Sequence, residues 1–152
     1  MPLATTTGKQ TRPRRLMLYG VHGIGKSTFA AEAPGAVFLP TEDGIADIDC
    51  ESYPLSTCFD QFMHYLQELH DEDHDRSTLV IDSLDWLEQL IWAEVGREQK
   101  VDSIEDIGYA KGYTFALKHW RKVLEKLEEL RDARGMTSIL LAHAKIERYT
   151  PP

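Results

Sequence analysis

The amino-acid sequence predicts an α/β fold, in which helices cover both faces of a mainly parallel β-sheet. Two observations predict it. Short, continuous apolar runs alternate along the chain with longer segments whose apolar residues recur at helical spacing. The apolar runs also lack the in-and-out alternation of strands that have one solvated face, as is typical of parallel strands buried on both sides. The 152 residues are enough for one domain with a sizeable core.

In the first half of the chain, glycine and proline separate the expected elements. Pro34 and Gly35 end the first helix, and Pro54 limits the third strand because proline donates no ladder hydrogen bond. Apolar residues from Phe59 to Leu69 recur as on one face of a helix. The expected elements are strands over 15–19 (RLMLY, a buried strand), 36–40 (AVFLP) and 52–55, and helices over 26–33 and 57–70.

The second half contains two strongly apolar runs, two helical patterns and one stretch without a pattern. That stretch, 96–112, holds three glycines and is expected to be a long, mobile loop. Gly135 stands where the C-terminal cap of the last helix belongs. The expected elements are strands over 77–82 and 136–144 and helices over 84–95 and 116–130, followed by a terminal loop.

Composition and charge narrow the class of protein. The two cysteines, Cys50 and Cys58, form no CxxC pair, so we expect reduced thiols in a cytoplasmic protein. No apolar run approaches the roughly 20 residues that cross a bilayer, so no membrane partner is expected. A net charge of −8 argues against a surface coated with basic residues for duplex DNA. Residues 1–13 are interpreted as a flexible basic arm before a domain over 14–152.

The sequence GVHGIGKS fits the pattern G-x-x-x-x-G-K-[ST] and lies between an expected strand and an expected helix. Such a loop turns backbone N–H groups and a helix N-terminus toward a phosphate chain. Lys26 is placed for the β- and γ-phosphates, Ser27 for Mg²⁺ and Thr28 for the α-phosphate. A glycine-rich turn without a ligand is the alternative. The expected nucleotide-binding residues are Gly20, Val21, His22, Gly23, Ile24, Gly25, Lys26, Ser27 and Thr28.

Asp82 ends the apolar run 77–82, at the sheet edge where open α/β sheets bind ligands. With the glycine loop upstream, we expect Asp82 and Ser27 to hold Mg²⁺, Asp82 acting through water. The alternative is that Asp82 caps the helix that begins near Leu84.

Hydrolysis also requires a group that orients the attacking water. Many ATPases place a glutamate directly after the metal-binding aspartate, but here Ser83 follows Asp82. Two carboxylates remain near this position. Asp85 lies just inside the next helix, and Glu42 follows the strand 36–40, at the same sheet edge as the glycine loop.

At these residues the chain resembles a known family. VFLPTEDGI and LVIDSLDWL resemble the RecA-type recombinase ATPase core. Together with YGVHGIGKSTFA, GYAKGY and SILLAHAKIERYTPP, they make residues 14–152 similar to phage RecA-like proteins of single-strand annealing and recombination. The resemblance implies that Glu42 orients the water and that His143 senses the γ-phosphate, where RecA-type proteins often have glutamine. Lys26, Glu42 and His143 are then the expected catalytic residues. The alternatives are that Glu42 is a helix-capping or solvated carboxylate and that His143 caps its strand without contacting the nucleotide.

The resemblance also implies partners. DNA contacts would come from the segments 96–113 and 144–150, in which basic and aromatic residues are interleaved, as suits single-stranded DNA. Acidic residues in the first segment weaken this expectation. A homo-oligomer, either a ring or a filament, is expected because RecA-type sites usually lie between subunits. The candidate DNA-binding residues are Arg97, Lys100, Tyr109, Lys111, Tyr113, Lys145, Arg148 and Tyr149.

The resulting hypothesis is a Mg²⁺-dependent ATPase that hydrolyses ATP to ADP and phosphate, stimulated by DNA, in phage recombination or single-strand annealing in the host cytoplasm. One alternative is a P-loop kinase or transferase acting on a small molecule. Another is a binding module that nucleotide switches without hydrolysis. Cores of the resembled type continue into at least one more strand, so we also expect a C-terminally truncated core with an open sheet edge.

Overall fold

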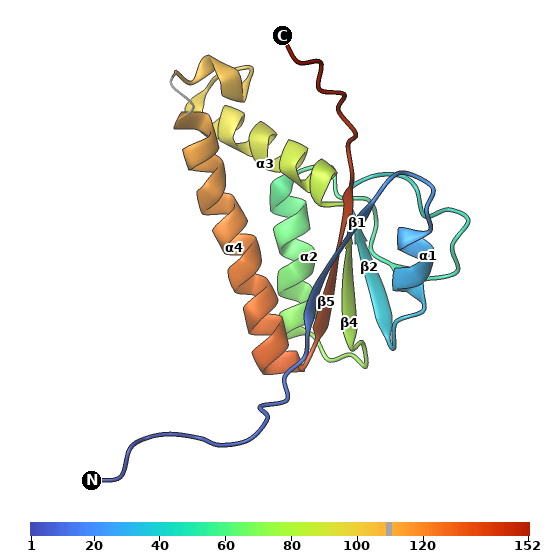
Figure 1. Ribbon diagram of the computed structural model, residues 1–152, viewed down its shortest axis with the longest axis vertical. Helices are drawn as coiled ribbons and strands as arrows, with labels where there is room; N and C mark the ends of the chain where they lie inside the picture. The colour runs from blue at the N-terminus through green and yellow to red at the C-terminus, as the bar shows by residue number, and fades with distance from the viewer. Residues whose placement is uncertain (109–110) are drawn as a thin grey trace.

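The computed structural model of the protein describes residues 1–108 and 111–152. In this part of the chain, five parallel strands form one sheet with helices on both faces, which confirms the predicted fold class (Figure 1). The strands are β1 (Arg15–Gly20), β2 (Ala36–Pro40), β3 (Glu51–Ser52), β4 (Thr78–Asp82) and β5 (Thr137–His143). The helices are α1 (Lys26–Ala31), α2 (Phe59–Asp71), α3 (Leu84–Gln99), the 3₁₀ helix η1 (Ile104–Asp106) and α4 (Lys111–Arg134).

The strand order is β1-β5-β4-β2-β3. In the ladder, Gly20 lies opposite His143, and Pro40 lies opposite Asp82. Asp82 in turn lies opposite Leu141, two residues before the end of β5. The carboxyl ends of β1, β2, β4 and β5 therefore meet at one edge of the sheet, and the residues that follow them are brought together there.

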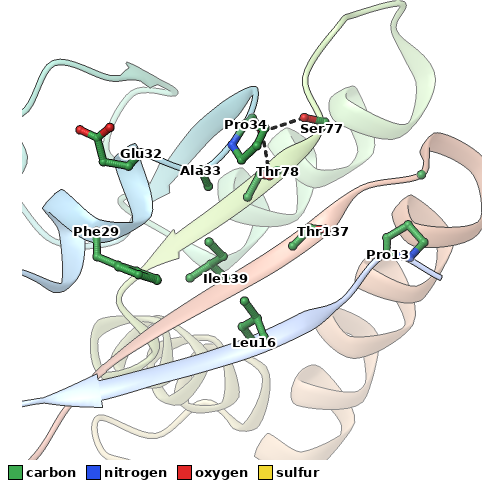
Figure 2. A pocket seen from close by; sticks show the side chains of 11 residues that line it. Pro13, Leu16, Phe29, Glu32, Ala33, Pro34, Ser77, Thr78, Thr137 and Ile139 are labelled. Atoms are coloured by element: carbon green, nitrogen blue, oxygen red, sulfur yellow. Dashed lines mark hydrogen bonds between the residues drawn. The ribbon is translucent and has the colours of Figure 1, made fainter. Parts of the chain in front are cut away.

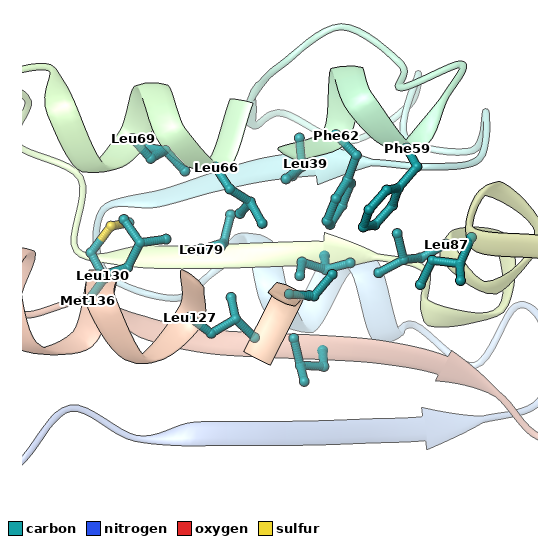
Figure 3. Packing of buried hydrophobic residues seen from close by; sticks show 14 of the residues in the cluster. Leu39, Phe59, Phe62, Leu66, Leu69, Leu79, Leu87, Leu127, Leu130 and Met136 are labelled. Atoms are coloured by element: carbon teal, nitrogen blue, oxygen red, sulfur yellow. The ribbon is translucent and has the colours of Figure 1, made fainter. Parts of the chain in front are cut away.

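The strands bury side chains on both faces, which explains their continuous apolar runs. On β2, Val37 and Leu39 face α2, α3 and α4, while Phe38 packs in a separate cluster with Ala30 of α1. The larger cluster is filled by α2, α3 and α4, as Figure 3 shows for the labelled side chains of α2 and β4. This helical layer anchors the strand ends that carry the candidate site.

Helix α1 is short and covers only part of its face of the sheet. Beside it lies a cavity of about 470 Å³, where Phe29 of α1, Leu16 of β1 and Ile139 of β5 contribute apolar surface (Figure 2). At the rim, the hydroxyls of Ser77 and Thr78 donate hydrogen bonds to the Pro34 carbonyl at 2.7 and 2.8 Å. This cavity is larger than the one at the glycine loop, but none of the expected site residues that the structure describes lines it.

The prediction that residues 15–19 form a buried strand is wrong in one respect. These residues form β1, but in the described part of the chain β1 lies at the sheet edge and pairs only with β5. Met17 is therefore 62% exposed and Tyr19 is 71% exposed.

The long loop expected over 96–112 is also corrected. Helix α3 continues to Gln99, η1 follows behind a capping box at Ser103, and α4 begins at Lys111. Two of the glycines lie inside helices at close contacts. A Cβ on Gly96 would lie 3.2 Å from the Val101 carbonyl oxygen, and a Cβ on Gly112 would lie 2.7 Å from the Ile104 carbonyl oxygen. These glycines permit close packing rather than a loop.

The chain before β1 has no regular structure, but its last residues are held on α4. Arg12 pairs with Glu128 at 2.8 Å and with Asp132 at 2.6 Å, and Arg131 donates a hydrogen bond to the Pro13 carbonyl at 2.8 Å. The N-terminus leaves the molecule at the end opposite the carboxyl ends of the strands (Figure 1). None of the helices in the described ranges is both long enough and apolar enough to cross a membrane.

Candidate functional site

The glycine loop connects β1 to α1 by a backbone path that glycine permits. Gly23 has φ +79° and Gly25, the N-cap of α1, has φ +101°. Side chains other than glycine rarely adopt such left-handed angles. A Cβ at either position would meet nothing within 4 Å, so backbone conformation rather than crowding explains these glycines.

Lys26 is fixed at the centre of the loop. Its side chain is buried, and its Nζ donates hydrogen bonds to the carbonyls of Gly20 at 2.9 Å and Val21 at 3.0 Å. An ammonium group has three donors, so one remains for an anionic ligand. The backbone of the loop therefore surrounds the positively charged ammonium group of Lys26.

The loop opens into a cavity of about 310 Å³ at the carboxyl edge of the sheet. Of the expected site residues, the structure brings the following to this cavity: His22, Gly23, Gly25, Lys26, Ser27, Thr28, Glu42, Asp82 and His143. The expected loop residues Gly20, Val21 and Ile24 do not line it. Asp43, Gly44 and Ile48 line the cavity but were not singled out from the sequence, although the carboxylate-rich turn after residue 40 was a signal for them.

Asp82 and Ser27 meet in this cavity. The Ser27 hydroxyl donates a hydrogen bond to Asp82 Oδ2 at 2.6 Å. The alternative role of Asp82 as a helix cap is not observed, because Ser83 is the N-cap of α3. Burial raises the pKa of Asp82 above its usual value; the nearby charge of Glu42 also raises it, and the Ser27 hydrogen bond lowers it. A buried carboxylate beside a hydroxyl is an oxygen donor set that fits Mg²⁺.

Glu42 and His143 form a second pair that lines the same cavity. His143 Nε2 lies 2.7 Å from Glu42 Oε1. An ionised carboxylate only accepts, so in that state the imidazole Nε2–H donates this hydrogen bond. The His22 ring lies 6.0 Å from that of His143, between centroids. The two expected catalytic side chains are thus in direct contact, although 101 residues separate them.

Thr41 joins the ends of β2 and β4, a role that sequence reasoning missed. Its buried hydroxyl donates to the Ser83 carbonyl at 2.6 Å and accepts from the Ser83 N–H at 2.9 Å. Its own N–H donates to the Asp82 carbonyl at 2.8 Å. These bonds continue the pairing of β2 and β4 past the last pair of their ladder. They fix the backbone just before Glu42 and just after Asp82.

A model of one protein family, described as an AAA domain, matches residues 12–152. The chain belongs to this AAA-domain family. Such domains are nucleotide-binding ATPase modules of the P-loop type, in keeping with the glycine loop and the parallel sheet. A comparison with curated proteins found no match.

The candidate DNA-binding residues of this AAA domain fall in two segments. In the first, Arg97 donates a hydrogen bond to Glu94 at 2.9 Å on α3, Lys100 caps α3, and Lys111 begins α4. The ring of Tyr113 packs edge-on against that of Trp92, with 5.8 Å between centroids. Tyr109 lies outside the described residues. The described part of this segment is therefore built mostly from helix ends rather than from a loop.

The second segment follows β5 directly. Lys145 and Glu147 form an ion pair at 2.9 Å, and Tyr149 is 82% exposed, with Arg148 beside it. Both segments lie toward the end of the molecule at which the strands finish (Figure 1). The AAA domain thus presents candidate polymer contacts at the same end as its cavity.

Proposed function

We propose that this AAA domain is a Mg²⁺-dependent ATPase of RecA-like type that acts in phage DNA recombination or single-strand annealing, with single-stranded DNA as its polymer partner. The observation that carries the proposal is the shared cavity. The glycine loop around Lys26 lines it together with two side-chain pairs, Asp82 beside Ser27 and Glu42 beside His143. These are the groups needed for a triphosphate, its metal ion and the attacking water.

In this proposal the loop amides and Lys26 bind the phosphate chain of ATP. Ser27 and Asp82 would hold Mg²⁺, and the ion would supply positive charge against the negative charge that develops on the transferred phosphate. The buried Asp82 gains from such an ion, because a cation offsets the cost of keeping its carboxylate ionised.

Glu42 orients a water molecule toward the γ-phosphorus and accepts a proton from it as the new P–O bond forms. The bond between the γ-phosphorus and the bridging oxygen breaks, and ADP and phosphate leave. The hydrogen bond from His143 supports this role because it fixes the Glu42 carboxylate before the reaction. When its ring is doubly protonated, His143 also offers Nδ1–H as a donor to the γ-phosphate.

The segment after β5 links this cavity to the proposed DNA contacts. His143 is the last residue of β5, and Lys145, Arg148 and Tyr149 follow within six residues. Basic side chains can neutralise the DNA backbone while an exposed tyrosine stacks on a base. A change at His143 on hydrolysis would therefore reach this segment through a short stretch of backbone.

We also propose that the active form is a homo-oligomer, a ring or a filament. Lys26 is the one lysine or arginine among the described residues that line the cavity. Phosphoryl transfer is commonly accelerated by a second cation that stabilises charge in the transition state. A neighbouring copy would supply that arginine or lysine.

Measurement of ATP turnover with and without single-stranded DNA tests the proposal. Hydrolysis to ADP and phosphate that DNA stimulates supports it. Phosphate transfer to a small molecule would identify a kinase or transferase instead. ATP binding without turnover in either condition would identify a nucleotide-switched binding module.

A further inference from the structure

Asp85 makes a contact that connects helix α3 to the end of β5. Its Oδ2 accepts a hydrogen bond from the backbone N–H of His143 at 2.7 Å. Asp85 is the second residue of α3, after the N-cap Ser83. An aspartate at this position commonly interacts with the N-terminus of its own helix. Here its carboxylate instead accepts a hydrogen bond from the neighbouring strand β5.

The place of His143 in the hydrogen-bond ladder of the sheet explains why its N–H bonds to Asp85. Backbone N–H groups of β5 alternate between its two neighbours. Thr137 donates to the Ser77 carbonyl on the β4 side, Ser138 donates to the Arg14 carbonyl on the β1 side, and Ala144 donates to Gly20 of β1. The N–H of His143 therefore points toward β4.

However, β4 ends at Asp82 and its backbone turns into α3, so no β4 carbonyl lies opposite His143. The Asp85 carboxylate takes the place of that missing carbonyl. A hydrogen bond to an ionised acceptor is stronger than one between neutral groups. It therefore holds the backbone of His143 at the point where β5 would otherwise be free on its β4 side.

His143 uses its side chain for the contact with Glu42, at 2.7 Å. We propose that Asp85 is the positioning residue of this site: by holding the His143 backbone, it keeps the imidazole on Glu42 and thereby aims the Glu42 carboxylate. The inference rests on the ATPase function proposed above. It also gives distinct roles to the two carboxylates that the sequence left open, because Asp85 orients a partner while Glu42 orients water.

Three variants and two measurements test this role. The carboxamide oxygen of Asp85→Asn still accepts the hydrogen bond but carries no charge, whereas Asp85→Ala removes the acceptor. Asp60→Ala is the matched control, because Asp60 is the second residue of α2, after its N-cap Cys58. We would measure the steady-state kinetics of ATP hydrolysis and, by NMR, the hydrogen exchange of the His143 amide in each full-length variant.

We expect Asp85→Ala to lower kcat about 10- to 100-fold with an almost unchanged KM, because misplacement by a fraction of an ångström weakens catalysis more than binding. Its His143 amide should exchange at least about tenfold faster, as expected when a hydrogen bond that closes the end of a strand is lost. Asp85→Asn should restore both values to near those of the wild type, and Asp60→Ala should change neither.

Two results would overturn the proposal. If Asp85→Ala keeps both kcat and the slow exchange of the His143 amide, the contact does not position the site. If Asp85→Asn loses turnover while its His143 amide stays protected, Asp85 acts through its charge, as an acid or base. A wild-type protein without ATP turnover would instead refute the proposed function, and the amide exchange would still decide whether Asp85 holds His143.

Discussion

Ser27 and Asp82 share a hydrogen bond of 2.6 Å that joins the first turn of α1 to the end of β4. The two residues lie 55 positions apart in the chain. Because the Asp82 carboxylate is buried, its charged form is unfavourable unless a cation lies nearby. The buried Asp82 carboxylate therefore destabilises the metal-free protein, and the same burial makes the site favour a divalent ion.

Asp82→Asn should stabilise the protein when Mg²⁺ is absent. The fold raises the pKa of Asp82 above its value in the unfolded chain. The charged carboxylate therefore lowers the free energy of unfolding at pH values above the folded-state pKa. Below the unfolded-state pKa the carboxyl is protonated in both states and has no such effect. At neutral pH we expect a gain of about 1 kcal/mol, or about 2–4 °C in Tm. Thermal unfolding at several pH values in EDTA measures it: the gain should shrink as the pH falls through the Asp82 pKa. A variant less stable than the wild type at neutral pH would contradict this account of the site.

Lys26→Ala should abolish ATP binding. The substitution removes the buried ammonium group that the Gly20 and Val21 carbonyls hold inside the loop. We expect affinity for ATP to fall by about 100-fold or more, since hydrogen bonds to charged groups that converge on one ligand are lost together. Calorimetric titration of both proteins measures the effect, with Lys122→Ala on the exposed side of α4 as the control. Equal affinity in the two variants would refute phosphate binding by this loop.

Glu42→Gln should bind ATP with nearly wild-type affinity and hydrolyse it at least about 100-fold more slowly. Glutamine keeps the shape and the hydrogen bonding of the side chain but does not accept a proton from water. Binding and single-turnover hydrolysis should be measured on the same preparation. Glu125→Gln, on an exposed part of α4, controls for the loss of one negative charge. Hydrolysis unchanged by Glu42→Gln would remove Glu42 from the mechanism.

Thr41→Val should destabilise the fold, whereas Thr41→Ser should not. Valine has nearly the shape of threonine but leaves the buried N–H and carbonyl of Ser83 without the Thr41 hydroxyl. We expect a loss of about 1–3 kcal/mol in the free energy of unfolding. Serine retains the hydroxyl and should lose less than about 1 kcal/mol. Urea unfolding of both variants measures the difference. A Thr41→Val variant as stable as Thr41→Ser would contradict the role of the hydroxyl, and a Thr41→Ser variant less stable than Thr41→Val would show that the methyl group matters more at this position.

Much of the fold could be predicted because its signals are local. The strand over 36–40 and the cap at Gly135 are found where expected, since an apolar run and a glycine at a helix end need no knowledge of distant residues. The third strand is shorter and earlier than expected, Glu51–Ser52. Pro54, which has no N–H to donate, lies beyond it.

Other features of the fold depend on contacts between segments, which the local sequence pattern does not reveal. Gly96 and Gly112 were interpreted as loop residues, yet each permits close packing against a carbonyl of a segment nearby in space. The exposure of β1 follows from its place in the strand order, which an apolar run does not reveal.

For the site, motif spacing identified the loop and Asp82, and position at the sheet edge left Glu42 and Asp85 as candidates. The resemblance chose Glu42 and added His143. Their roles stay predictions. The supporting hydrogen bonds of Thr41 and Asp85 could not be predicted, because they join strand ends that only the folded sheet brings together.

The most direct test of the account is the position of the metal ion in a crystal of the protein with Mn²⁺ and a non-hydrolysable ATP analogue, located by anomalous diffraction. We predict that residues 20–27 wrap the phosphates and that the ion binds Ser27 Oγ directly, with the Asp82 carboxylate on it directly or through one water. An ion bound elsewhere, or an Asp82 side chain turned away from it, would contradict the central claim.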